Sequence, residues 1–346
     1  MTVHTIYFGG GTPSLLPIIS LEKILSCVDK NLRLTNPLEI TLEANPGTVS
    51  EGYLVDLQAL GVNRISFGMQ SANPSELALL ERQHSFVDVV NAVDWARAAG
   101  FTNLNLDLIY GLPQQALSSW LQSIDAAISL TPEHLSLYAL TLEKGTPMQR
   151  KVQGGFLPEP DPDQAADMYD AASDRLAKVG YIQYEISNWA KRDLHGKMLA
   201  CQHNLQYWRS QPYLGLGAGA HGFIDKKRTV NVASPQAYIR RLEKDQEKGS
   251  ETSVFPETPA SIEIQPIDQQ TEIGETMMMG LRLVLEGISD QDFSERFGMR
   301  LKDRFSVEIE RLTKWGLLEW AGEKADILRL TSRGRLLGNQ VFREFI

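Results

Sequence analysis

Short runs of β-forming residues alternate with segments of helical periodicity along the first half of the chain. Five such runs lie at 5–8, 39–45, 64–68, 104–109 and 134–140, and amphipathic helices are expected between them at 21–34, 50–60, 86–99 and 117–130. Alternation at this spacing predicts an α/β fold with a parallel sheet and right-handed crossovers. Periodicity alone leaves open whether the sheet closes into a barrel.

The alternation stops near residue 191, after a further expected helix at 164–179 and a strand near 184–187. Residues 247–270 are rich in Pro, Ser, Thr, Gln and Glu and are expected to form a linker. Beyond them, helices near 271–285, 289–297 and 301–315, a strand at 327–330 and a final helix predict a small winged-helix-like domain. We therefore expect a barrel part at 1–225, a connecting helix and linker at 226–270, and a C-terminal domain at 271–346.

The composition excludes several classes of protein. No uncharged apolar run approaches the ~20 residues that a membrane-spanning helix needs, and the first six residues lack the basic start and apolar core of a secretion signal. Two cysteines, Cys27 and Cys201, cannot form a disulfide framework. A formal net charge of −9 argues against nucleic acid as a main partner, because phosphate neutralisation needs a basic face. We expect a cytoplasmic protein.

A run of three glycines, Gly9-Gly10-Gly11, directly follows the first expected strand and leads into Thr12-Pro13. Without Cβ atoms, its backbone groups can closely approach a ligand, such as a phosphate or the amino end of an amino-acid cofactor. The alternative is a simple tight turn. The run is not a P-loop, because no Lys-Ser/Thr pair follows, and the dinucleotide-binding fingerprint is also absent.

Polar side chains also accompany the next strands: Glu43 ends the second, Gln70 follows the third with Arg82 beyond it, and Asp107 lies within the fourth. In a parallel barrel the carboxyl ends of the strands form one rim, where binding sites are built. Carboxylates and amides accept ribose hydroxyls, and an arginine can hold a carboxylate with two hydrogen bonds. Taken singly, Asp107 could cap a helix and Arg82 could form a surface ion pair. Their joint placement favours a ligand site.

Four motifs occur in a fixed order: residues 6–13 (IYFGGGTP), 43–46 (EANP), 66–71 (SFGMQS) and 107–113 (DLIYGLP). They closely resemble the radical S-adenosylmethionine proteins of the oxygen-independent coproporphyrinogen oxidase superfamily, and the resemblance extends from Ile6 to the final helix. It implies a partial (β/α) barrel that lacks its first strand. It also implies an S-adenosylmethionine site in which Gly10 and Gly11 hold the amino end, Arg82 the carboxylate, and Gln70 and Asp107 the ribose hydroxyls, with Thr12 and Glu43 in the same pocket.

Residues 203–208 (HNLQYW) resemble the HNxxYW signature of the HemW haem chaperones, and residues 330–337 resemble their C-terminal domain. The resemblance implies a protein that binds haem and delivers it to acceptor haemoproteins. A neutral imidazole can ligate iron and aromatic rings can cover a porphyrin face, so His203 is the candidate iron ligand and Tyr207 and Trp208 are candidate haem contacts. The alternatives are a hydrogen-bonded core position for His203, and Cys201 as the ligand. His221 is either a second rim histidine or a turn residue.

Members of this superfamily hold a [4Fe–4S] cluster through a CxxxCxxC loop ahead of the GGGTP run. Neither Cys27 nor Cys201 reproduces that triad, so we expect the cluster only in a form that carries the preceding segment, and no reductive cleavage of S-adenosylmethionine by this sequence. We expect a start at an internal Met rather than a natural cluster-free form. The resemblance leaves open a radical decarboxylase, oxygen-independent coproporphyrinogen III oxidase, and also a homodimer and peripheral membrane contact through acceptors.

Overall fold

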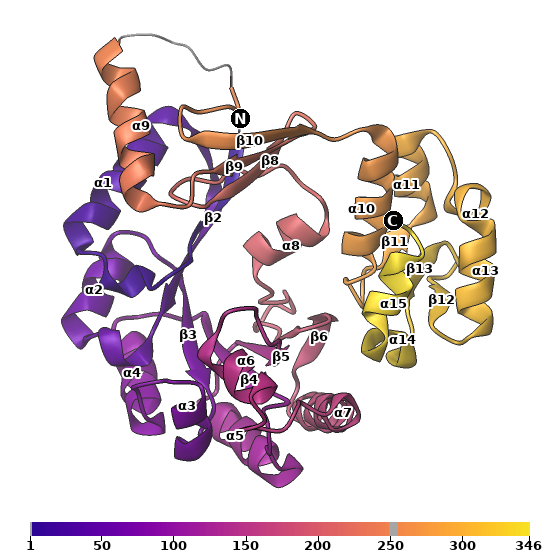
Figure 1. Cartoon of the computed structure of the whole chain (residues 1–346), viewed down its shortest axis with the longest axis horizontal. Coiled ribbons are helices and arrows are strands. Elements are labelled where there is room, and N and C mark those ends of the chain that lie inside the picture. The colour runs from indigo at the N-terminus through magenta and orange to yellow at the C-terminus, as the bar shows by residue number, and fades with distance from the viewer. Residues whose placement is uncertain (1, 249–254) are drawn as a thin grey trace. The chain divides into compact units, whose positions relative to one another are not determined.

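The computed structural model describes residues 2–248 and 255–346 (Figure 1). The described residues form two compact units, Met1–His203 and Asn204–Ile346. This division lies ahead of the expected barrel boundary at 225, which stays a prediction. Residues 249–254 of the expected linker lie outside the described part of the chain.

A seven-stranded mixed sheet runs through the first unit in the order β1-β2-β3-β4-β5-β7-β6. Strands β1 to β5 are parallel to their neighbours, whereas β7 is antiparallel to both β5 and β6. The five expected parallel strands are therefore present, and they form the partial α/β barrel that the sequence predicts. The strand bounds are Thr2–Phe8 (β1), Arg33–Ala44 (β2), Arg64–Gln70 (β3), Leu104–Tyr110 (β4), His134–Ala139 (β5), Ile182–Glu185 (β6) and Asn188–Ala190 (β7).

The helices that follow β1 to β4 lie along the outer side of the parallel part of the sheet (Figure 1). Side-chain caps begin several helices of this unit: the hydroxyls of Ser50 and Ser85 accept the first free backbone N–H groups of α2 and α4, and the Asp161 carboxylate does so for α7. The bounds are Ile18–Asn31 (α1), Glu51–Ala59 (α2), Pro74–Leu79 (α3), Phe86–Ala98 (α4), Leu117–Ser129 (α5), Pro147–Gln153 (α6) and Pro162–Lys178 (α7).

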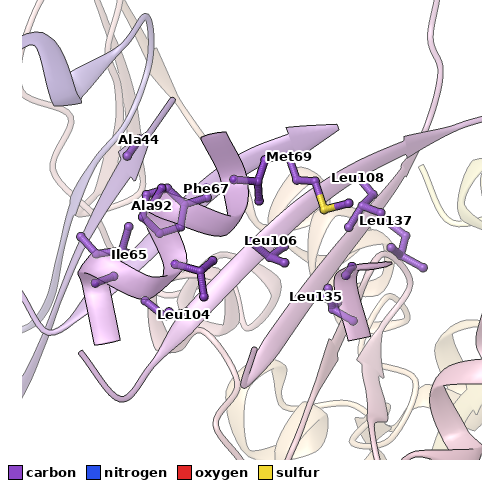
Figure 2. Packing of buried hydrophobic residues seen from close by; sticks show 14 of the residues in the cluster. Ala44, Ile65, Phe67, Met69, Ala92, Leu104, Leu106, Leu108, Leu135 and Leu137 are labelled. Carbon is purple, nitrogen blue, oxygen red and sulfur yellow. The ribbon is translucent and has the colours of Figure 1, made fainter. Parts of the chain in front are cut away.

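The two faces of the parallel strands differ in polarity, because successive side chains in a strand point to opposite sides. Figure 2 shows the apolar set, which packs against the helices and is almost fully buried. It includes Ile65, Phe67 and Met69 of β3, Leu104, Leu106 and Leu108 of β4, and Leu135 and Leu137 of β5. Each such side chain contributes roughly 1.5–3 kcal/mol on burial. The alternate positions carry polar groups, so the inner face of the half-barrel is lined by hydrogen-bonding side chains.

Helix α1 begins and ends three residues before the expected range of 21–34, and β2 begins at Arg33, so the expected strand at 39–45 is too short. The cause is tertiary: Thr2 and Val3 pair with Arg33 and Leu34, which draws these residues into the sheet. Helix α3 was not expected, because six residues give no helical period.

The second unit contains two three-stranded antiparallel sheets, β10-β9-β8 and β11-β13-β12. The expected strand at 327–330 is confirmed as β13, the central strand of the second sheet, whereas the expected linker contains β10. No helix in the described part of the chain is long and apolar enough to cross a membrane. The strands are β8 (His221–Ile224), β9 (Lys227–Asn231), β10 (Ser261–Pro266), β11 (Ile288–Ser289), β12 (Leu318–Ala321) and β13 (Ile327–Leu330).

Helix α8 (Gln202–Trp208) spans the division between the units. The expected helices near the C-terminus are present, but the third is divided after Arg304 and the last after Leu336. The helices of the second unit are α9 (Pro235–Lys248), α10 (Gln269–Gly280), α11 (Asp290–Phe297), α12 (Leu301–Arg304), α13 (Ser306–Lys314), α14 (Ser332–Leu336) and α15 (Gly338–Arg343).

Candidate functional site

The glycine run forms an exposed loop at the carboxyl end of β1. Gly10 and Gly11 have φ angles of 78° and 63°, in the left-handed region that favours glycine, and a Cβ at either position would meet no atom within 4 Å. This backbone conformation therefore favours glycine at both positions. The open space beside them lets another molecule lie directly against the backbone.

Glu43, at the end of β2, ties this loop to the sheet. Its Oε1 accepts a hydrogen bond from Tyr7 Oη at 2.7 Å, and its Oε2 accepts one from the Gly10 backbone N–H at 3.3 Å. Burial, and then the charge of Glu43, raises the pKa of Tyr7. Tyr7 is therefore a permanent donor that orients the carboxylate. The structure thus brings together Glu43 and Gly10, two of the expected site residues.

Asp107 lies on the inner face of β4 and is held by two side chains. Its Oδ2 accepts from Ser66 Oγ at 2.9 Å, and its Oδ1 accepts from Asn105 Nδ2 at 2.8 Å. Burial raises the pKa of Asp107, while these hydrogen bonds and the charge of Arg64 act in the opposite direction. The carboxyl group is thus a fixed acceptor rather than the helix cap that was the alternative.

Gln70 and Arg82 complete the expected set. Gln70 ends β3 with a φ of 65°, just after an irregularity in the β3–β4 pairing, and it is buried. Arg82 follows α3 with an exposed side chain, and its backbone N–H bonds to Leu77 O at 2.9 Å. No side-chain hydrogen bond joins Gln70, Arg82 or Asp107 to Glu43 among the described residues. Gln70 ends β3 and Asp107 lies within the neighbouring strand β4, whereas Arg82 lies beyond α3.

A buried carboxylate that sequence patterns did not reveal anchors α3, the helix just before Arg82. Glu76 is 7% exposed and accepts hydrogen bonds from Ser71 Oγ at 2.6 Å, Gln115 Nε2 at 3.0 Å and Ser119 Oγ at 2.6 Å. Three donors from separate segments compensate the burial of this carboxylate. The network fixes α3 against α5 and so sets where the Arg82 segment begins.

His203 lies in the first unit, against β1. Its Nδ1 is 2.8 Å from Thr5 Oγ1, and its ring stacks on that of Tyr7 with centroids 4.8 Å apart and an angle of 19° between the planes. Burial, and then the charge of Arg64, lowers the pKa of His203 to about 4, so the imidazole is neutral at pH 7. Cys201 is buried beside it and donates to Glu39 Oε1 at 3.6 Å.

Tyr207 and Trp208 are engaged with aromatic and cationic groups of the second unit. The Tyr207 and Tyr213 rings meet edge to face, with centroids 4.6 Å apart. The Arg282 guanidinium lies over the Trp208 ring at 5.0 Å, and buried Trp208 Nε1 has no hydrogen-bond partner among the described residues. His221 is exposed at the start of β8.

Comparisons with known proteins agree with this architecture. Residues 1–127 match the radical SAM superfamily, and residues 267–337 match the HemN C-terminal domain. Coproporphyrinogen III oxidase (HemN) from Escherichia coli has a similar structure, with a TM-score of 0.79 and 22% identity over 99% of this chain and 78% of that one. At this identity the likeness shows the fold alone.

Curated sequences give higher identities. "Heme chaperone HemW" of Bacillus subtilis is 37% identical over 99% of this chain and 86% of its own length. The protein of the same name from Mycobacterium tuberculosis is 36% identical over 100% of this chain and 81% of its own length. The mouse protein "Radical S-adenosyl methionine domain-containing protein 1, mitochondrial" is 37% identical over 91% of this chain and 70% of its length. The chain therefore belongs to the HemW family of radical S-adenosylmethionine proteins.

Proposed function

We propose that this protein binds haem and passes it to acceptor haemoproteins. The observation that carries the proposal is the 37% identity to "Heme chaperone HemW" of Bacillus subtilis across nearly the whole chain. The HNxxYW segment at 203–208 supports it, because within six residues of sequence it supplies a neutral imidazole and two large aromatic rings. The likeness to coproporphyrinogen III oxidase, at 22% identity, supports a shared fold and carries no information about the reaction.

We further propose that the loop and strand ends of the half-barrel bind S-adenosylmethionine. The open space beside Gly10 and Gly11 fits a ligand that lies against the backbone, with Thr12 next to it and the Glu43 carboxylate behind it. S-adenosylmethionine supplies amino, carboxylate and ribose hydroxyl groups for recognition. In this proposal Gly10, Gly11, Thr12 and Glu43 take the amino end, Arg82 the carboxylate, and Gln70 and Asp107 the ribose hydroxyls.

The residues of this chain do not fit an iron–sulfur cluster. Its two cysteines are far apart in sequence, Cys27 exposed and Cys201 buried, and a radical SAM cluster needs three thiolates. The described part of the chain also contains no group of three or more His, Cys, Asp or Glu side chains placed to hold a metal ion. The proposal therefore concerns binding of the nucleoside and of haem.

For haem, we propose His203 as the iron ligand and Tyr207 and Trp208 as ring contacts. A pKa of about 4 keeps the His203 imidazole neutral, which ligation requires.

Haem titration followed by the Soret band tests the proposal. The intact chain should shift the Soret band at an equimolar ratio, and the His203→Ala variant should change the band position and weaken binding at least tenfold. His221→Ala, which alters an exposed histidine, is the matched control and should bind as the unmodified chain does. Unchanged binding by His203→Ala would remove this ligand, whereas a complete lack of binding would overturn the chaperone proposal. Product formed from coproporphyrinogen would favour the oxidase instead.

A further inference from the structure

We propose that a chain of buried side chains behind Asp107 holds its carboxylate in place for the ribose hydroxyls of an S-adenosyl nucleoside. This hydrogen-bond chain runs through Asn105, His134 and Tyr184, from β4 across β5 to β6. These three residues are 1–3% exposed. They are positioning residues, and the inference rests on the nucleoside site proposed above.

The chemistry of each partner fixes the direction of every hydrogen bond. Asn105 Nδ2 donates to Asp107 Oδ1 at 2.8 Å, so Asn105 Oδ1 faces the other way and accepts from His134 Nδ1 at 2.6 Å. The proton of the neutral imidazole is then on Nδ1, and His134 Nε2 accepts from Tyr184 Oη at 2.9 Å. All three donors in the chain therefore point toward the carboxylate.

Two serines lock the Asn105 amide in this orientation. Ser66 Oγ lies 2.7 Å from Asn105 Nδ2 and donates its own proton to Asp107 Oδ2 at 2.9 Å. Ser136 Oγ donates to Asn105 Oδ1 at 3.1 Å. A flipped amide would turn its oxygen toward the Asp107 carboxylate and would lose both donors to Oδ1.

The titratable groups around Asp107 favour an ionised Asp107 and a neutral His134. Burial, and then the charge of Arg64, lowers the pKa of His134 well below its usual value, so the imidazole stays neutral. Burial, then the charge and hydrogen bond of Glu43, and then the charge of Asp107 raise the pKa of Tyr7, on β1, so this phenol stays protonated. Arg64, on β3, is the cation of this set, and its charge favours an ionised Asp107.

Tyr184 lies at the far end of this hydrogen-bond chain, so it can be replaced without changing a residue of the proposed ligand site. With phenylalanine there, the proton stays on His134 Nδ1, and the buried Nε2 loses the hydroxyl that fixes the ring. A less firmly held imidazole orients the Asn105 amide less well. The Asn105 donor to Asp107 would then be weaker, the pKa of Asp107 would rise further, and the ribose would bind less tightly.

The test is titration calorimetry of S-adenosylhomocysteine with the intact chain between pH 5.5 and 8.5. Tyr184→Phe should weaken binding about 5- to 10-fold at pH 7.5 and move the acid limb of the affinity profile upward by about half a pH unit. The matched control is Tyr181→Phe, which removes another buried hydroxyl, one that donates to Pro132 O. The control should stay within about twofold of the unmodified chain and keep its pH profile.

The outcomes separate the two proposals. If Tyr184→Phe and Tyr181→Phe bind alike and share the same pH profile, the positioning role is wrong while the nucleoside site stands. If the unmodified chain binds no nucleoside over this pH range, the site itself is overturned, and the positioning role with it. Should Tyr184→Phe not fold, as judged by circular dichroism, His134→Leu removes the imidazole donor to Asn105 Oδ1. That variant should shift the acid limb in the same direction, and an unshifted limb would overturn the proposal.

Discussion

Gly10 occupies a backbone conformation that an L-residue reaches only with strain. Its φ is 78°, but a Cβ there would meet no atom within 4 Å, so Gly10→Ala separates backbone strain from steric conflict. We expect Gly10→Ala to lower the free energy of unfolding by about 1–2 kcal/mol. Gly52→Ala, also with open space around its Cβ but inside α2, should raise it by up to about 1 kcal/mol. Urea unfolding of both variants measures the difference, and equal effects would contradict the strain argument.

The pKa of His203 makes stability depend on pH. The folded value is about 4 and the usual value 6.5, so between these the unfolded chain binds a proton that the folded chain does not. The contribution of His203 is complete above pH 6.5 and is lost as the pH falls toward 4. At pH 5 we expect a loss of up to about 2 kcal/mol relative to pH 7.5.

Urea unfolding at pH 7.5 and pH 5 measures this loss. His203→Gln should show a smaller drop between the two pH values, and the part due to neutral His134 should persist in the variant. His221→Gln should behave as the unmodified chain does. An identical drop in His203→Gln would show that this imidazole is not the source.

The sequence motifs located the loop and strand ends of the proposed site, but they did not identify the side chains that hold the site residues in place. The left-handed loop at Gly10 and Gly11 follows from glycine chemistry, and the position of Glu43 follows from the end of a strand. The partners Tyr7 and Ser66 belong to neighbouring strands, and only the register of the sheet brings them within reach. Register depends on pairing between distant segments, so local patterns carry little information about it.

Among the elements, the long amphipathic helices were predictable and the short ones were not. α4 and α5 lie within one residue of their expected bounds, because each gives more than three turns of period and α4 begins with a capping box. α3 has only six residues and depends on the contacts of Glu76 rather than on propensity.

A substitution of Glu76 tests whether its side-chain contacts hold α3 in place. Glu76→Ala would leave the donors of Ser71, Gln115 and Ser119 without an acceptor, and we expect a loss of about 2–4 kcal/mol in the free energy of unfolding. Amide hydrogen exchange should rise most in residues 72–84, which include α3. Glu51→Ala, at an exposed position in α2, should change stability by less than about 1 kcal/mol. Unchanged exchange in 72–84 would mean that Glu76 does not anchor α3.

At the scale of the whole chain, local sequence patterns did not predict strands β8 to β10. Residues 227–231 (KRTVN) lack the alternation of a half-buried strand, and most of β10 is exposed. No apolar–polar pattern therefore marks these two segments as strands. Ion pairs accompany these strands, such as Lys227 with Glu257 and Arg228 with Glu275. Pairs of this kind form between segments far apart in sequence and leave no local pattern.

Charge over the whole molecule leads to a prediction about partners. The C-terminal domain is winged-helix-like, and helix-turn-helix relatives of such domains bind the major groove of DNA. The chain carries a net charge of −9, and acidic and basic residues are nearly balanced in residues 269–346, so the net charge supplies no overall attraction for phosphate. We expect no binding of a 30-base-pair duplex at 150 mM salt in an electrophoretic mobility assay, with lysozyme as a basic control. Binding whose affinity falls linearly with the logarithm of salt concentration would contradict this, because that slope counts the phosphates that a basic face neutralises.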